Sequence, residues 1–346
     1  MVSLEAKRDR LVLRWRGAKY EWLIEPRYWR NPLIYSALIA LLPVLVYYAS
    51  PSLLPTVISA NLLAAVAIPV SWMTVATGRV NFGPQFFVGA GGYIAALLSV
   101  YYGFGPLQTL PVAILGSLAL GFTLSPLSII SRGLYYTLLT MIFPLVFLEI
   151  TYIYTGIFKG DVGLSGITPL LTLGSATLTQ LATAFLSLAM MGAYLWIVDK
   201  ILRSRYGLAM AAINDDEEVA EAIGVNINKI KIRNFAFSAC LVGAVGWFFA
   251  HYHGTFAGVT YLPLTYMIKI LLAIIIGGRA QIYGCVVGAY FITFLELLLI
   301  RNLGGLSPVI LPIVLLALLV ALNEGLFGIY RKRHYREYLP TLRVRR

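Results

Sequence analysis

Residues 54–76 read LPTVISANLLAAVAIPVSWMTVA, a run without a single charged side chain. The hydrocarbon core of a bilayer is about 30 Å thick, and each helical residue advances about 1.5 Å, so about 20 apolar residues can cross it. The run is therefore predicted to be a membrane-spanning helix. The rest of the chain contains further runs of the same kind.

The composition also indicates a protein that lies mostly in a membrane. Of the 346 residues, 59% are apolar and 12% are charged, about half the charged share of a soluble domain. This balance excludes a disordered chain and argues against a soluble globular enzyme. The 31 Gly and 16 Pro fit closely packed polytopic helices. Cys240 and Cys285 both lie in apolar stretches, so no disulfide framework is predicted.

The hydropathy pattern predicts an all-α, polytopic integral membrane protein with about ten transmembrane helices. The predicted spans are 33–49, 54–76, 86–103, 109–130, 134–155, 177–199, 234–251, 265–278, 283–300 and 308–329. The eighth, 265–278, is short for a spanning helix. It is expected either to begin earlier, near Tyr261, or to be a broken helix.

Basic residues are distributed unequally between the two sides that these spans define. The side of the N-terminus holds 24 of the 27 Lys and Arg, the other side holds Lys159 and Arg301, and Lys269 falls within a span. Cytoplasmic loops carry the excess of Lys and Arg, so both termini are predicted to be cytoplasmic. This topology accounts for the net charge of +12, and no nucleic-acid partner is predicted.

Three segments follow from this topology. Residues 1–30 are predicted to be a basic cytoplasmic segment, 31–330 a transmembrane domain with a cytoplasmic loop at 200–233, and 331–346 a basic cytoplasmic tail. Residues 4–25 mix apolar and basic residues, which is typical of an interfacial helix on the inner leaflet or of a solvated tail. The first 30 residues lack a continuous apolar core, so no cleavable signal peptide is expected.

The loop at 200–233 is the most polar part of the chain and holds its acidic cluster. Asn214 can cap a helix, acids in a first turn suit the positive end of the helix dipole, and Gly224 can end the helix. We therefore expect a short helix of about three turns. Its composition alone fits either a solvated connecting helix or a docking surface for a cytoplasmic partner.

The stretch 204–226, SRYGLAMAAINDDEEVAEAIGVN, resembles the cytoplasmic loop of ABC-transporter permeases for branched-chain amino acids, the LivH and LivM type. That family carries the pattern S-R-x-G-R-A-x-x-A-I-R-x-[DN]-E-x-A-A-x-A-x-G-[IV]-[DN]. The resemblance implies a coupling helix that inserts into a groove of the ATP-binding subunit. The contact residues it implies are Asn214, Asp215, Asp216, Glu217, Glu218, Ala220, Glu221, Ala222 and Gly224.

Other stretches resemble the same family, in the same order, over roughly residues 60–300. They are GRVNFGPQFFVGAGGY at 78–93, GDVGLSG at 160–166 and GGRAQIYG at 277–284. Pro84 stands where the family usually has His, and Lys269 where it commonly has Glu. The substrate implied is a branched-chain or other hydrophobic amino acid, with urea, short amides or another small solute as the alternative.

Ionisable side chains inside spans are costly to bury and mark functional or structural sites. Glu149 and Lys269 both fall in the outer halves of their spans. They are predicted either to form a structural ion pair or to line the translocation path. His251 and His253 could join a metal site, but no Cys or acid lies near them in sequence, so no metal or other cofactor is predicted.

The resemblance implies the rest of a transport machine in the plasma membrane of a prokaryote. Its parts would be a second permease of the family, two ATP-binding subunits and an extracytoplasmic substrate-binding protein that docks on the outer loop with Lys159 and Asp161. Gly277-Gly278 lacks the Gly-Lys-Ser/Thr of a phosphate loop, so no catalytic residue is predicted and ATP hydrolysis is expected in the partners. The rival interpretations are a stand-alone secondary transporter, a membrane enzyme and a structural membrane subunit.

Overall fold

The computed structural model describes residues 3–7, 10–15, 18–23, 42–131, 133–278 and 282–306, with isolated positions between 310 and 317. It divides into two units, residues 1–54 and residues 55–346, each of which is described by itself. The boundary predicted between residues 30 and 31 and the tail 331–346 lie outside the described residues. These domain limits therefore stay predictions.

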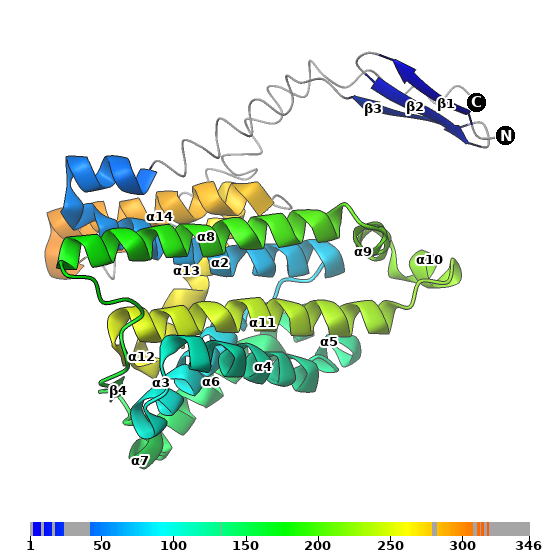
Figure 1. Ribbon diagram of the computed structural model, residues 1–346. Coiled ribbons are helices and arrows are strands. Elements are labelled where there is room, and N and C mark those ends of the chain that lie inside the picture. The colour runs from blue at the N-terminus through cyan, green and yellow to red at the C-terminus, as the bar shows by residue number, and fades with distance from the viewer. Residues whose placement is uncertain are drawn as a thin grey trace. The chain divides into compact units, whose positions relative to one another are not determined.

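The first unit contains a three-stranded antiparallel sheet (Figure 1). Its strands are β1 (Ser3–Lys7), β2 (Arg10–Trp15) and β3 (Ala18–Leu23). The register pairs Leu4 with Leu13 and Leu11 with Trp22, so apolar side chains share one face of the sheet. For residues 4–25 an interfacial helix was one of two open alternatives; the described residues form strands instead, because their apolar residues alternate with a period of two.

Eight helices in the described part of the chain are long and apolar enough to cross a membrane, and they correspond to the second to ninth predicted spans. The long helices and α5 are α2 (Leu54–Thr77), α3 (Pro84–Tyr102), α4 (Pro106–Leu124), α5 (Leu127–Ile130), α6 (Leu134–Ile153), α8 (Ala176–Leu202), α11 (Ile227–His253), α13 (Leu264–Gly277) and α14 (Ile282–Leu303). Short 3-10 turns, η1 (Pro51–Leu53) and η2 (Gly304–Leu306), precede α2 and follow α14. Much of the first and tenth predicted spans lies outside the described residues, so the count of ten stays a prediction.

Helix α11 is the most buried of these helices and packs along α3 and α4 (Figure 1). Small residues allow the close approach: a Cβ added to Gly91 would lie 2.0 Å from the Gly243 carbonyl oxygen, and one added to Gly246 would lie 2.0 Å from the Val88 oxygen. The glycine-rich segments 89–92 and 243–246 therefore meet at this interface. This agrees with the close helix packing expected from the many glycines of the chain.

A buried amide joins three other helices. Asn61 of α2 donates from Nδ2 to the Ser187 hydroxyl of α8 at 3.0 Å, and its Oδ1 accepts from the Tyr290 hydroxyl of α14 at 2.5 Å. Asn61 is completely buried, and both ends of its amide are thereby satisfied. Helix α14 also packs on α13, where Gly277 and Gly284 bring the backbones together.

The eighth span is a broken helix, which was one of the two predicted alternatives. A single turn, α12 (Gly258–Tyr261), stops before Leu262 and Pro263, and α13 begins at Leu264. Pro263 has an extended backbone and caps α13, as expected of a residue that cannot continue the preceding turn. The Gly258 N–H donates to the Tyr93 hydroxyl at 2.7 Å and fixes the broken segment against α3.

The connection between α6 and α8 is tied to the end of α11. It contains α7 (Thr155–Phe158) and β4 (Leu164–Ser165), and β4 pairs with β5 (Thr255–Phe256). His251 is buried; its Nδ1–H donates to the Thr168 carbonyl and its Nε2 accepts from the Thr109 hydroxyl, both at 2.7 Å. His251 therefore anchors this loop, and the described residues contain no group of three His, Cys, Asp or Glu that could hold a metal.

Candidate functional site

The loop after α8 contains two short helices rather than one. They are α9 (Arg205–Asp215) and α10 (Glu217–Ala222). Ser204 caps α9, and Asp216 caps α10 by accepting from the N–H groups of Glu218 and Val219 at 2.9 and 3.1 Å. The predicted cap at Asn214 and the length of three turns are wrong, because the extended backbone of Asp216 breaks the helix two residues later.

The predicted end of this helix at Gly224 is confirmed. Gly224 has a φ of 88°, a left-handed conformation that favours glycine. Its N–H donates to the Glu221 carbonyl at 2.9 Å, and the Val225 N–H donates to the Ala220 carbonyl at 3.0 Å. These two bonds satisfy carbonyl groups that the end of α10 would otherwise leave unpaired.

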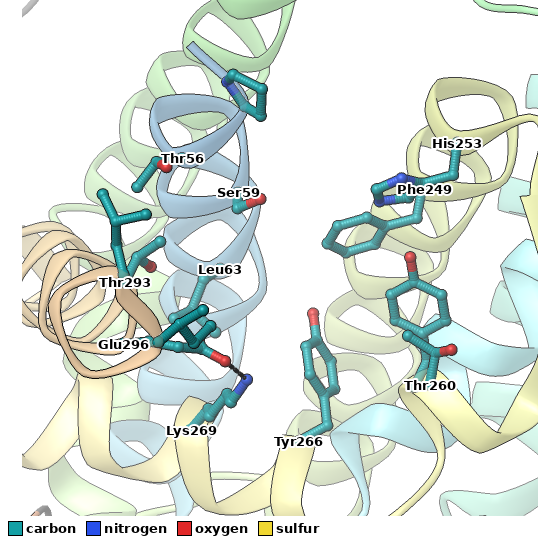
Figure 2. Close-up of a pocket in the computed structure, with 14 residues that line it drawn as sticks. Thr56, Ser59, Leu63, Phe249, His253, Thr260, Tyr266, Lys269, Thr293 and Glu296 are labelled. Atoms are coloured by element: carbon teal, nitrogen blue, oxygen red, sulfur yellow. Dashed lines mark hydrogen bonds and ion pairs between the residues drawn. The ribbon is translucent and has the colours of Figure 1, made fainter. Parts of the chain in front are cut away.

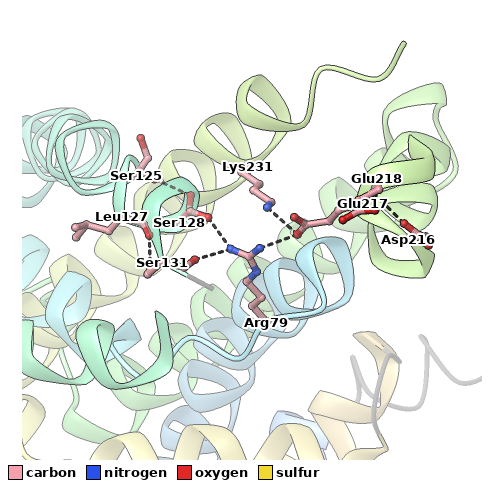
Figure 3. A network of polar contacts seen from close by, with 9 residues as sticks. All are labelled: Arg79, Ser125, Leu127, Ser128, Ser131, Asp216, Glu217, Glu218 and Lys231. Carbon is pink, nitrogen blue, oxygen red and sulfur yellow. Dashed lines mark hydrogen bonds and ion pairs between the residues drawn. The ribbon is translucent and has the colours of Figure 1, made fainter. Parts of the chain in front are cut away.

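Glu217, in the first turn of α10, is bound by two cations (Figure 3). Its Oε1 accepts from Arg79 Nη2 at 2.8 Å and from Lys231 Nζ at 2.7 Å. The side chains of Arg79 and Lys231 are only 10% and 4% exposed, so the ion pairs are largely shielded from water. Arg79 follows the end of α2, and Lys231 lies in the first turns of α11.

Arg79 extends this contact to a fourth segment. Its Nη1 donates to the carbonyl oxygens of Ser128 and Ser131, at 2.9 and 2.8 Å, in and after α5. We name this set of contacts the Glu217 network: Arg79, Ser128, Ser131, Glu217 and Lys231. Charged hydrogen bonds thereby link α10 to α11 and to the segment between α2 and α3. Through Arg79 they also reach the segment between α4 and α6.

The remaining predicted contact residues of the loop differ in how exposed their side chains are. Asn214 Oδ1 lies against the turn after α2, since a Cβ added to Gly78 would be 2.9 Å from it. Ala220 is buried, whereas Asp215, Asp216, Glu218, Glu221, Ala222 and Gly224 are exposed. Two apolar side chains of the same loop, Val219 and Ile223, are 58% and 70% exposed. The loop therefore presents acidic and apolar groups together on its free surface.

Tyr206 and Arg203 adjoin this loop. The Tyr206 hydroxyl donates to the Ile230 carbonyl at 3.1 Å, and burial raises its pKa while the nearby Arg233 lowers it. The hydrogen bond to Asp199 raises the pKa of Arg203, which is 73% exposed. Neither group changes its charge near neutral pH, so both serve the structure of the loop.

At the opposite end of α2 lies a pocket of about 370 Å³ (Figure 2). We name it the Lys269 pocket. Its walls come from α2, α11, α12, α13 and α14, and its lining residues are Pro55, Thr56, Ser59, Leu63, Phe249, His253, Thr260, Tyr261, Tyr266, Lys269, Thr293, Glu296, Leu297 and Ile300. The helices that hold the Glu217 network at one end, α2 and α11, therefore line this pocket at the other.

Lys269 pairs with Glu296, not with Glu149. Lys269 Nζ lies 2.5 Å from Glu296 Oε1, across the interface of α13 and α14. Glu149 is exposed on α6, which packs on α3, so the predicted Glu149–Lys269 pair is wrong. Spacing along the chain places both residues at a similar depth, but only the packing of the helices decides which side chains meet.

Lys159 and Asp161, the residues predicted to contact a binding protein, are both exposed on the loop between α6 and α8. Lys159 ends α7 in a left-handed conformation with a φ of 64°. The segment after them is held by Thr168, whose N–H donates to the Ser99 hydroxyl at 2.9 Å. The two charged side chains therefore stand on a loop that is anchored nearby.

The sequence interpretation missed four of the five residues of the Glu217 network, including both of its cations. Arg79 and Lys231 entered only as basic residues that orient the protein. The signal for Arg79 was its place in the 78–93 motif, directly after the glycine of a tight turn. Nothing in the sequence pairs either cation with Glu217, because their separations along the chain are 138 and 14 residues.

Comparison with known proteins agrees with this architecture. Residues 52–323 match the family described as "Branched-chain amino acid transport system / permease component". The "High-affinity branched-chain amino acid transport system permease protein LivM" of Escherichia coli (strain K12) is 24% identical over 279 residues, which cover 74% of this chain and 65% of the relative. The "Probable branched-chain amino acid transport permease protein LivH" of Methanocaldococcus jannaschii is 24% identical over 298 residues, covering 80% of this chain and 92% of the relative.

The chain thus spans slightly less than two thirds of the length of the first of these relatives. No solved structure matches it. The family match covers well over half of the chain, and the described helices are those of a multi-pass membrane protein. The chain belongs to the family of branched-chain amino acid permeases of ABC transporters.

Proposed function

We propose that the chain is a membrane-spanning subunit of an ATP-driven importer for branched-chain or other hydrophobic amino acids. It would work in the plasma membrane of a prokaryote, with both termini in the cytoplasm. The relatives named as branched-chain amino acid permeases support the substrate class. The unequal distribution of Lys and Arg supports the orientation.

The observation that carries the proposal is the Glu217 network. A helix that receives force from an ATP-binding subunit must transmit it to the spans. Glu217 of α10 binds cations beside the end of α2 and in the start of α11, and Arg79 passes the contact on to α5. A displacement of α10 therefore acts on several membrane segments at once.

The same two long helices connect this network with the Lys269 pocket. Lys231 and Phe249 are 18 residues apart on α11, a helical distance of about 27 Å. Thr56 and Ser59 of α2 line the pocket, and α2 ends just before Gly78 and Arg79. Movement of α10 would shift α2 and α11 together and open or close the pocket, which is an alternating-access scheme.

The exposed surfaces of the loops support the proposed partners. The acidic and apolar face of α10, with Val219 and Ile223, would dock in the ATP-binding subunit. Lys159 and Asp161 would contact an extracytoplasmic substrate-binding protein. A second permease of the family would complete the transmembrane part, and ATP would be hydrolysed by the partner subunits alone.

The test is co-purification from native membranes in mild detergent, with partners identified by mass spectrometry. The double variant Val219→Asp/Ile223→Asp changes two exposed side chains of the α10 surface and leaves the Glu217 network intact. It should release the ATP-binding subunit while the second permease is retained. Leu208→Asp, at a site 71% exposed on α9, is the matched control and should retain all partners.

Recovery of the chain without any ATP-binding subunit, and with transport that responds to an ion gradient, would contradict the proposal. Retention of the ATP-binding subunit by the double variant would contradict the docking role of α10. Both outcomes are read from the same purification, because the unaltered chain and the control are processed beside the variant.

A further inference from the structure

The Lys269 pocket holds one charge of each sign within reach of its cavity. Lys269 and Glu296 are 27% and 29% exposed, so their ion pair is not sealed between helices. Figure 2 shows the pair between α13 and α14, beside the open part of the pocket. A ligand with one positive and one negative group can therefore replace this ion pair with two new ones, one to Lys269 and one to Glu296.

The pocket also holds a hydroxyl group without a partner. The hydroxyl oxygen of Tyr266 is buried and forms no hydrogen bond with the described residues. Tyr266 lies three residues before Lys269 on α13, and Figure 2 shows its ring pointing into the pocket next to the ion pair. A buried hydroxyl without a partner is costly, so a ligand oxygen that accepts a hydrogen bond from it would be stabilised here.

The opposite side of the pocket is aromatic. The ring centroids of Phe249 and Tyr261 are 4.8 Å apart, and those of Tyr261 and Tyr266 are 5.8 Å apart in an edge-to-face arrangement. Leu63 and Leu297 add aliphatic surface. The cavity of about 370 Å³ lies near the lower end of the range of small-molecule sites, roughly 300–1,000 Å³.

We propose that this pocket binds a zwitterionic amino acid with an aliphatic side chain by exchange of ion partners, which rests on the proposed function and extends it. The α-carboxylate of the ligand accepts hydrogen bonds from Lys269 and the Tyr266 hydroxyl, and the α-ammonium donates to Glu296. The ligand side chain packs on the aromatic wall. After the exchange each protein charge still faces an opposite charge. A ligand with only one of the two charges would leave Lys269 or Glu296 unpaired in the membrane, which is strongly unfavourable.

The test measures equilibrium binding of radiolabelled leucine to the complete purified transporter, without the binding protein. The competitors are 4-methylpentanoate, which lacks the ammonium group, and 3-methylbutylamine, which lacks the carboxylate. We expect each to bind at least about tenfold more weakly than leucine, since a hydrogen bond to a charged group contributes roughly 1.5–3 kcal/mol, about 10-fold to 150-fold.

Three variants separate recognition from folding. Lys269→Met/Glu296→Gln removes both charges and leaves neither one unpaired; leucine affinity should fall at least about tenfold. Lys269→Glu/Glu296→Lys keeps an ion pair with its charges exchanged and should also bind leucine at least about tenfold more weakly. Tyr266→Phe keeps the ring and removes one hydrogen bond, and leucine affinity should fall about fivefold.

Lys200→Met is the matched lysine control. The Nζ of Lys200 lies 3.8 Å from the Trp196 ring centre, and this variant should bind leucine as the unaltered protein does.

Unchanged leucine affinity in the doubly neutral variant would overturn the inference and make the pair purely structural. Equal affinity for leucine and its two truncated analogues would overturn it as well. ATP hydrolysis and co-purification of the ATP-binding subunit are measured on the same samples. If these persist while leucine fails to bind, the inference is wrong and the proposed function stands; if the ATP-binding subunit is absent from every sample, the proposed function itself fails.

Discussion

The Glu217 network and the Lys269 pocket are both built on ion pairs, but they differ in what surrounds the charges. Glu217 accepts hydrogen bonds from two cations, and Arg79 also donates from Nη1 to two backbone carbonyls. The Lys269–Glu296 pair borders a cavity and the Tyr266 hydroxyl, which has no hydrogen-bond partner among the described residues. A closed network suits the transmission of force, whereas a pair that borders a cavity suits the exchange of a ligand.

The largest expected effect comes from removing Arg79, whose hydrogen bonds connect the Glu217 network. Arg79→Ala removes three hydrogen bonds of a side chain that is 10% exposed, two of them to backbone carbonyls. We expect a loss of about 3 kcal/mol in the free energy of unfolding, together with loss of ATP-driven uptake. Thermal unfolding in detergent and uptake by proteoliposomes measure the two effects.

Arg79→Lys sharpens this prediction. Lysine keeps the charge but lacks the planar fork that reaches Glu217 and the carbonyls at once. Its stability should lie between those of the unaltered protein and Arg79→Ala. Equal stability of all three proteins would contradict the closed network.

The second prediction concerns the packing that joins the two sites. Gly91→Ala places a Cβ 2.0 Å from the Gly243 oxygen, so α3 and α11 must separate. We expect a destabilisation of about 2 kcal/mol, measured by thermal unfolding. Gly192→Ala on α8 is the matched control, because no atom lies within 4 Å of its added Cβ. Gly192→Ala should not destabilise, because Ala favours a helix more than Gly does; equal destabilisation by both substitutions would contradict the role of the close contact.

The third prediction separates the two sites from each other. Gly224→Ala meets open space, so its cost comes only from the left-handed backbone at φ 88°. We expect a destabilisation of about 1 kcal/mol, reduced uptake per ATP hydrolysed and unchanged leucine affinity. Gly174→Ala, also in open space, is the control. A fall in leucine affinity with Gly224→Ala would mean that the two regions do not act separately.

The smallest expected effect comes from removing an exposed ion pair, Arg203 with Asp199, just before α9. Arg203 binds Asp199 at 2.7 Å, one turn away on the chain, with its side chain 73% exposed. Arg203→Ala should change the free energy of unfolding by less than about 1 kcal/mol, and the shift in thermal midpoint should be far below that of Arg79→Ala. A loss as large as that of Arg79→Ala would show that burial does not distinguish the two arginines.

The sequence predicted the features that depend on local pattern. Spans two to nine follow from apolar runs, and the end of α10 follows from Gly224. The family match confirms the resemblance that the 204–226 loop carried. Each of these signals lies within a short stretch of chain, where composition and spacing decide the local structure.

The predictions that failed depend on contacts in space or on a competing local pattern. Glu149 and Lys269 have similar depths, yet α13 packs on α14 and gives Lys269 the carboxylate of Glu296. Asn214 can cap a helix, but it is the Asp216 side chain that accepts hydrogen bonds from two N–H groups in the first turn of α10. In residues 3–23, alternation with a period of two gives strands, which neither the interfacial helix nor the solvated tail included. The roles of Arg79 and Lys231 appear only when four segments come together.

The central claim is that α10 transmits force through Glu217, and the ratio of leucine taken up to ATP hydrolysed tests it most directly. The ratio is measured in proteoliposomes that contain the complete transporter with the substrate-binding protein, for the unaltered chain and for Glu217→Gln. Asp199→Asn is the control, because it removes a carboxylate that pairs with the exposed Arg203. We expect Glu217→Gln to keep its ATP-binding subunits and their ATP hydrolysis but to lower the ratio at least about tenfold, which corresponds to about 1.4 kcal/mol. A ratio equal to that of the unaltered protein would contradict it.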